Sequence, residues 1–116
     1  MKTLINLETV DSLKSLGDPD LFDRLVDLFS ETGKRQVDSI HQFMQSNNWS
    51  QLHLEAHSLK SSAMSLGADE LGNMCLILET KTSDATELEK QSALVPKLQE
   101  VFANSITELK ALQNKG

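Results

Sequence analysis

Apolar residues recur at helical spacing along most of the chain. The longest pattern runs from residue 18 to about residue 46 and keeps one face apolar, at Phe22, Leu25, Val26, Phe29, Val37, Ile40 and Met44. Steps of three and four predict further helices from about residue 48 to 66, from 68 to about 79, and through the last part of the chain. No segment alternates between apolar and polar positions as a strand does, so the pattern predicts an all-α fold.

The stripes also predict the core. A short leading helix presents Leu7, Val10 and Leu13, with Leu16 as a further candidate. The later helices present Leu52, Ala56, Leu59, Ala63, Leu66, Leu71, Met74, Cys75, Leu78, Leu88, Leu98, Val101, Phe102, Ile106, Leu109 and Leu112. The last helix also contributes Leu94 or Val95. Gly33 within the long helix costs about 1 kcal/mol relative to Ala, which indicates a close packing contact at that position.

Residues typical of helix ends divide these segments. Gly17 ends the leading helix, and Asp18 is expected to cap the long helix with Pro19 at its first position. Asn48 is expected to cap the next helix, and Gly67 to end it. Pro96 predicts a kink or a restart of the last helix near residues 92 to 96.

Short loops connect these helices, so neighbouring helices are expected to run antiparallel. The predicted fold is an up-and-down antiparallel four-helix bundle with a short extra N-terminal helix. The chain has 116 residues, which suits a single domain over 1–116.

Composition narrows the classes of function. A net charge of −6 without a basic cluster argues against nucleic-acid binding and against anionic membranes. The longest apolar run, Met74 to Leu78, is too short to span a bilayer, and the first residues lack the apolar core of a signal peptide. We therefore expect a cytoplasmic protein. The single cysteine, Cys75, excludes an internal disulfide and is expected to be buried.

The segment "HLEAHSLKSSAMSLGA" carries the candidate chemistry, with His53 and His57 four residues apart. Two histidines at this spacing can share a zinc ion, but the zinc-protease pattern needs Glu directly after the first His. Here Glu55 comes one place late, no third ligand lies nearby, and Lys60 adds positive charge. We therefore predict no metal site.

Two interpretations remain for this face of the helix. In the first it is a solvated surface, which is the expectation for His53 and for His41 on another helix. In the second His57 is a nucleophile toward phosphorus, with Lys60 one turn later as the cation near the phosphoryl oxygens and Ser61 leaving room for a partner.

A phosphorus nucleophile also needs an acceptor that fixes the imidazole tautomer. His57 lies about nine residues before the turn at Leu66–Gly67 and Glu79 about eleven after Ala68, so the helical rise puts them at nearly the same level. Glu79 is thus predicted to accept a hydrogen bond from His57. Leu76 is either an exposed docking residue or buried.

The sequence "AHSLKSSAMSLGA", followed by "DELGNMCLILE", resembles the signature of the histidine-containing phosphotransfer (HPt) domains of bacterial multistep phosphorelays. That signature has Gly where this chain has Ser61. At the position 22 residues after the histidine, members of the family have Gln or Glu. Glu79 occupies this position here. The resemblance is sharp over residues 56 to 79 and extends to the whole chain in helix order and length.

This resemblance implies that His57 accepts a phosphoryl group from an aspartyl phosphate on a receiver domain and passes it to an aspartate on another. The protein is then a carrier with no kinase activity and no cofactor of its own, because the magnesium belongs to the receiver. Its expected partners are response-regulator receiver domains, a hybrid sensor histidine kinase, or both. Ser61, Met64 and Leu76 are the expected docking residues, and the protein is expected to be a monomer.

The sequence leaves two alternatives open. One is a helical interaction module in which His57 is never phosphorylated. The other is a domain excised from a hybrid sensor kinase, against which the initial Met and the complete set of helices argue.

Overall fold

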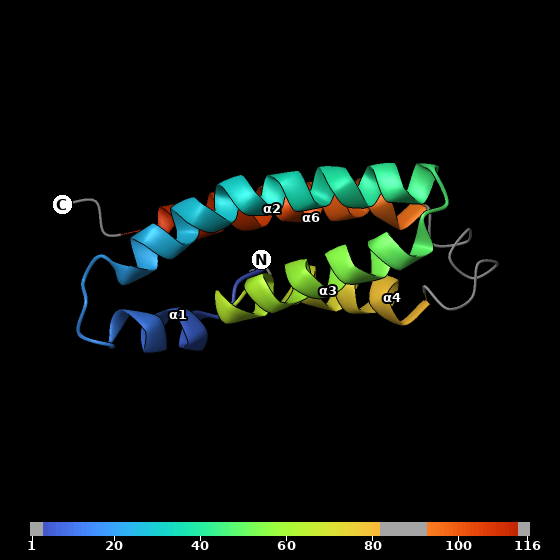
Figure 1. The fold of residues 1–116 in the computed structure, drawn as a ribbon. Helices are drawn as coiled ribbons and strands as arrows, with labels where there is room; N and C mark the ends of the chain where they lie inside the picture. Colours follow the sequence, from blue (N-terminus) through green and yellow to red (C-terminus); the bar gives the residue numbers. More distant parts are fainter. Residues whose placement is uncertain (1–3, 82–92, 114–116) are drawn as a thin grey trace.

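The computed structural model describes residues 4–81 and 93–113, and their regular structure is helical. The helices are α1 (Leu7–Lys14), α2 (Leu21–Gln45), α3 (Trp49–Ser65), α4 (Asp69–Lys81) and α6 (Leu94–Ala111). Helix α2 lies along α6, and α3 along α4, with successive helices running in opposite directions (Figure 1). The predicted up-and-down bundle with a short leading helix is confirmed. None of the described helices is both long and apolar enough to cross a membrane.

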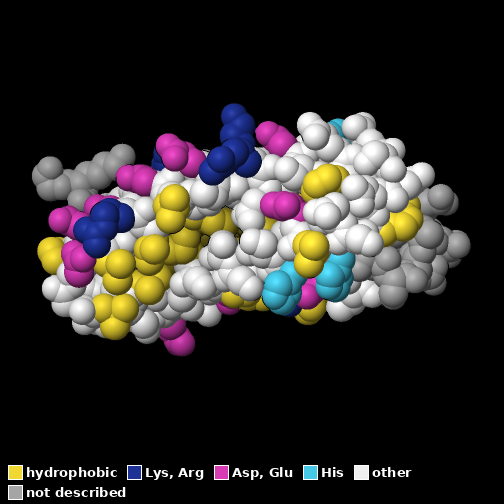
Figure 2. All heavy atoms as spheres, in the orientation of Figure 1, with side chains coloured by type: hydrophobic (Ala, Val, Ile, Leu, Met, Phe, Trp, Pro, Cys, Tyr) yellow, Lys and Arg dark blue, Asp and Glu magenta, His cyan; other side chains and the backbone are white. Residues whose placement is uncertain are grey.

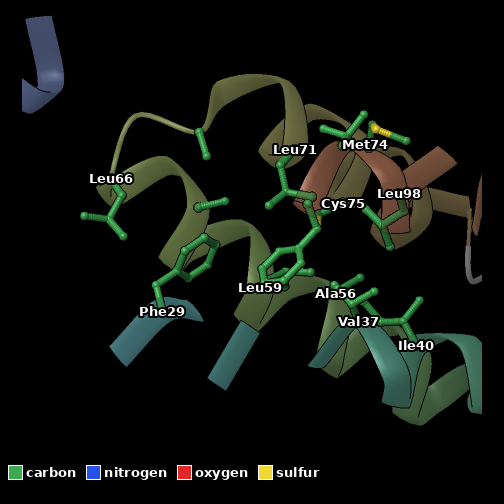
Figure 3. Close-up of a cluster of buried hydrophobic side chains, with 14 of the residues drawn as sticks. Phe29, Val37, Ile40, Ala56, Leu59, Leu66, Leu71, Met74, Cys75 and Leu98 are labelled. Carbon is green, nitrogen blue, oxygen red and sulfur yellow. The ribbon is translucent and has the colours of Figure 1, made fainter. Parts of the chain in front are cut away.

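The predicted stripes form the core. From Phe22 to Leu78, every predicted core position is buried apart from Leu25, which is half-buried. Figure 3 shows side chains from four helices pointing toward one another, among them Val37, Leu59, Cys75 and Leu98. Predicted Leu88 lies outside the described residues. The prediction is wrong for Leu7, which is 50% exposed, and for the candidate Leu16, which is 66% exposed, because α1 ends at Lys14 and buries only Val10.

Most helix ends follow the sequence signals. The side chain of Asn48 accepts a hydrogen bond from the Gln51 amide at the start of α3, and Gly67 adopts a left-handed φ of +83° just after its end. Helix α6 begins at Leu94, within the range predicted for a kink or a restart, and the residues before 93 lie outside the described part of the chain. Pro96 lies in the first turn of α6, where backbone N–H groups have no partner within the helix, so its missing donor costs little.

The start of α2 differs from the prediction. The helix begins at Leu21 with Asp20 as its N-cap, two residues later than expected for a cap at Asp18. The carboxylate of Asp18 instead accepts a hydrogen bond from the Asp20 amide, and its main-chain carbonyl accepts one from the Leu21 amide. Asp18 therefore forms a turn before the helix, as short acidic side chains often do. It also pairs with Arg24, whose hydrogen bond is the main cause that lowers the pKa of Asp18.

Gly33 marks a close approach of α2 to α6. A Cβ atom at this position would lie 2.6 Å from the nearest ring carbon of Phe102. That ring packs edge-on against Phe29 with 5.7 Å between centroids. The predicted close contact is confirmed.

The turn between α3 and α4 is held by the N-terminal segment. The Asn6 amide donates to the Gly67 carbonyl at 2.7 Å, and the Asn6 side chain donates to Asp69 at 3.1 Å. Ile5 beside them is almost fully buried. These contacts fix the hairpin of α3 and α4, and that hairpin carries the candidate site.

Candidate functional site

His57 lies on α3 directly after the buried Ala56, at the edge of the core stripe. Its side chain is 57% exposed, so a partner can reach the ring. Two histidine side chains gather on one face of the molecule with an acidic side chain between them (Figure 2).

Glu79 on α4 joins the candidate residues. Its Oε1 lies 2.6 Å from Nδ1 of His57, and its Oε2 lies 2.6 Å from Nζ of Lys60. The side chain of Glu79 is only 13% exposed, so its carboxylate is largely shielded from solvent in both contacts. The prediction that Glu79 and His57 meet across the hairpin is confirmed, and Lys60 shares the same carboxylate.

The charges at this carboxylate decide where the protons lie. The hydrogen bond from Lys60, and after it the one from His57, lowers the pKa of Glu79 below its ordinary value, although partial burial acts in the opposite direction. An ionised carboxylate can only accept hydrogen bonds. Nδ1 of His57 therefore carries a proton and donates it to Glu79, and in the neutral ring Nε2 keeps the lone pair of a nucleophile.

His53 has a role that the sequence did not reveal. It is exposed as expected, but its Nδ1 lies 3.0 Å from the main-chain carbonyl oxygen of Glu79. The expectation of an ordinary solvated residue was incomplete. Its position four residues before His57, on the same face of α3, was the one signal that could have indicated contact with α4.

Among residues 4–81 and 93–113, no group of three His, Cys, Asp or Glu residues is arranged so that it could hold a metal ion. Cys75 is buried against the core, and this burial raises the pKa of its thiol to about 12. The thiol is thus protonated at neutral pH and is a poor nucleophile.

The predicted docking positions lie at the surface. Ser61 is exposed, and Leu76 is 42% exposed, so the open question about Leu76 is decided in favour of exposure. Met64 is 36% exposed, and it also lies over Gly72 of α4, where a Cβ would come within 2.6 Å of its methyl carbon. Leu54, which is not part of the predicted docking set, is 59% exposed and lines a shallow groove with Leu76 beside Glu79.

Comparison with known proteins identifies the class. The model of the Hpt domain family matches residues 24–112. The chain belongs to this family of histidine-containing phosphotransfer domains, which are phosphoryl carriers of phosphorelays and interact with receiver domains and histidine kinases.

One solved structure illustrates the shared fold. The crystal structure of histidine-containing phosphotransfer protein B (HptB) from Pseudomonas aeruginosa PAO1 is 23% identical and superposes with a TM-score of 0.87, over 97% of this chain and 96% of that one. At this identity the likeness establishes the fold. No curated protein matched the chain.

Proposed function

We propose that His57 is the phosphoacceptor and that it relays a phosphoryl group between aspartates of two receiver domains. The observation that carries this proposal is the Glu79 carboxylate, which binds Nδ1–H of His57 and Nζ of Lys60 at 2.6 Å each. This arrangement leaves Nε2 of an exposed imidazole as the nucleophile and puts a cation one helical turn away.

In the proposed step, the lone pair of Nε2 attacks the phosphorus of an aspartyl phosphate. A P–N bond forms, the P–O bond to the aspartate breaks, and the electron pair leaves with the aspartate carboxylate. Positive charge develops on the imidazole, and the ionised Glu79 at Nδ1 stabilises it. The ammonium of Lys60 stabilises charge on the phosphoryl oxygens. The reverse step delivers the group to the second aspartate.

We propose that the protein needs no cofactor of its own and that magnesium is bound by the receiver. It has no kinase activity, since the sequence contains no nucleotide-binding motif. Exposed Ser61, Met64 and Leu76 surround the site and receive the partner, with the small Ser61 allowing close approach to His57.

We propose that the protein acts in the cytoplasm as a monomer, with receiver domains, a hybrid sensor histidine kinase, or both as partners. Its net charge of −6 opposes self-association and nucleic-acid binding. Sedimentation velocity should give one species near the chain mass of 12.9 kDa, and a dimer at micromolar concentration would contradict the monomer.

The test is intact mass spectrometry after mixing with phosphorylated receiver domains. Wild type, His53→Gln and His41→Gln should each gain one phosphoryl group that is labile in acid and stable in base, and His57→Gln should gain none. Phosphate on His57→Gln would place the acceptor elsewhere. No phosphate on any variant, across several receivers, would favour a helical interaction module.

A further inference from the structure

The main chain of Glu79 is held from outside its own helix. Nδ1 of His53 on α3 lies 3.0 Å from the carbonyl oxygen of Glu79. A carbonyl oxygen only accepts hydrogen bonds, so Nδ1 of His53 must carry the proton. The contact thus runs from a side chain of α3 to the backbone of α4, close to the site but not at the reacting atoms.

The location of this bond in α4 matters. Glu79 lies in the last turn of α4, which ends at Lys81. Helix ends fray more readily than helix centres. A donor from α3 therefore stabilises the part of α4 that presents the Glu79 carboxylate.

The same residue is thus held at both ends. His53 binds its main chain, while His57 and Lys60 bind the two oxygens of its carboxylate. If the main chain of Glu79 moves, Oε1 moves away from Nδ1 of His57. The imidazole then loses the partner that keeps its proton on Nδ1 and its lone pair on Nε2.

We infer that His53 is a positioning residue for phosphotransfer: by donating from Nδ1 to the Glu79 carbonyl, it fixes the carboxylate that sets the tautomer of His57. This inference rests on the proposed function of His57. It assigns His53 no contact with the phosphoryl group, and the proton on its Nδ1 is the feature that matters.

The chain allows a sharp test because asparagine can replace the relevant part of histidine. Both Nδ1 of histidine and Nδ2 of asparagine are bonded to Cγ, so His53→Asn keeps an N–H donor at nearly the same place. His53→Leu has a branch of similar position without a donor. His41→Leu on α2 is a control for loss of a histidine away from the site.

Two measurements are needed. The tautomer of unphosphorylated His57 is read from its ring ¹⁵N shifts at mildly alkaline pH, and the rate of phosphoryl transfer is measured from a phosphorylated receiver. We expect His53→Leu to shift His57 toward the Nε2–H tautomer and to slow transfer about three- to tenfold, the effect of loosening one hydrogen bond. His53→Asn should restore both values, and His41→Leu should change neither.

The outcomes separate the two hypotheses. An unchanged His57 tautomer and rate in His53→Leu, or an equal loss in His53→Leu and His53→Asn, would overturn the positioning role. If wild type takes no phosphate, the proposed function fails, and the tautomer measurement still decides whether His53 orders Glu79.

Discussion

At the level of single residues, Lys60 has two roles: it binds Glu79, and it faces the incoming phosphoryl group. Its Nζ lies 2.6 Å from Oε2 of Glu79, and its side chain remains 23% exposed. It can therefore hold Glu79 in the resting state and still face an incoming phosphoryl group. Lys60→Ala should slow transfer about tenfold without preventing it, a smaller loss than for a fully buried donor in an oxyanion hole.

Single-turnover transfer from a phosphorylated receiver checks this prediction. Lys34→Ala removes an exposed lysine of α2 and is the matched control. Transfer by Lys60→Ala at the wild-type rate would show that transfer needs neither the charge of Lys60 nor its hydrogen bond to Glu79.

The residues of the site differ in how far the sequence could predict them. The contact of His57 with Glu79 could be predicted because the two residues lie at similar distances along their helices from the same tight turn, so the helical rise brings them to the same level. The bond from His53 ends on a main-chain carbonyl, which any residue at position 79 would supply. The spacing of His53 and His57 could therefore indicate contact of His53 with α4, but not the atom that His53 binds.

At the level of helices, two glycines with positive φ form a natural comparison. Gly17 has a φ of +92° and open space around the position that a Cβ atom would take, whereas a Cβ on Gly67 would lie 2.8 Å from the Asn6 carbonyl oxygen. Gly17→Ala should cost about 1 kcal/mol, from the left-handed conformation alone. Gly67→Ala should cost about 2–4 kcal/mol, because a backbone clash is added.

Urea unfolding followed by circular dichroism measures both losses. Hydrogen exchange of the Asn6 amide, which donates to Gly67, should be faster in Gly67→Ala and unchanged in Gly17→Ala. Equal losses of unfolding free energy in the two variants would mean that the N-terminal segment moves away from residue 67 without a free-energy penalty.

The contact between α2 and α6 gives a second prediction about helices. Alanine at Gly33 gains about 1 kcal/mol of helix propensity, but its Cβ would lie 2.6 Å from the Phe102 ring. Overpacking costs about 1–3 kcal/mol, so Gly33→Ala should be neutral to about 2 kcal/mol less stable. In a Phe102→Leu background the same change should become stabilising.

A double-mutant cycle of unfolding free energies tests this coupling. The sign of the Gly33→Ala effect should differ between the two backgrounds. The same sign and size in both would show that the Phe102 ring does not limit the approach of the helices.

For the molecule as a whole, apolar periodicity and short loops were sufficient to predict the bundle. The tertiary contacts of the N-terminal segment were not predictable in this way. The Leu4 amide donates to Glu108, 104 residues away, and Asn6 binds Gly67. These bonds depend on where the chain passes after the bundle has formed, and no local pattern encodes that path. The predicted start of α2 was wrong for a different reason. An Asp side chain can accept a backbone hydrogen bond at the start of a helix or in a turn, and the sequence does not distinguish the two at Asp18.

The stability of the whole molecule should depend on pH through Glu79. The pKa of Glu79 is lowered from its ordinary value of 4.5, mainly by the hydrogen bond from Lys60. The native state thus binds a proton less readily than the unfolded state, so this carboxylate stabilises the fold above pH 4.5, and the contribution is lost as pH falls through the lowered value. Wild type should exceed Glu79→Gln in unfolding free energy by up to about 1 kcal/mol at pH 7, and this difference should shrink as pH falls below 4.5 and through the lowered pKa.

Urea unfolding at a series of pH values measures the difference. Glu100→Gln is the matched control, because Glu100 is exposed on α6 and forms no ion pair within the described part of the chain. A difference for Glu79→Gln that stays constant from pH 7 to pH 3 would mean that the carboxylate acts through packing alone. A difference that disappears in acid for Glu79→Gln but is absent for Glu100→Gln would tie the stability of the α3–α4 hairpin to the same charge that orients His57.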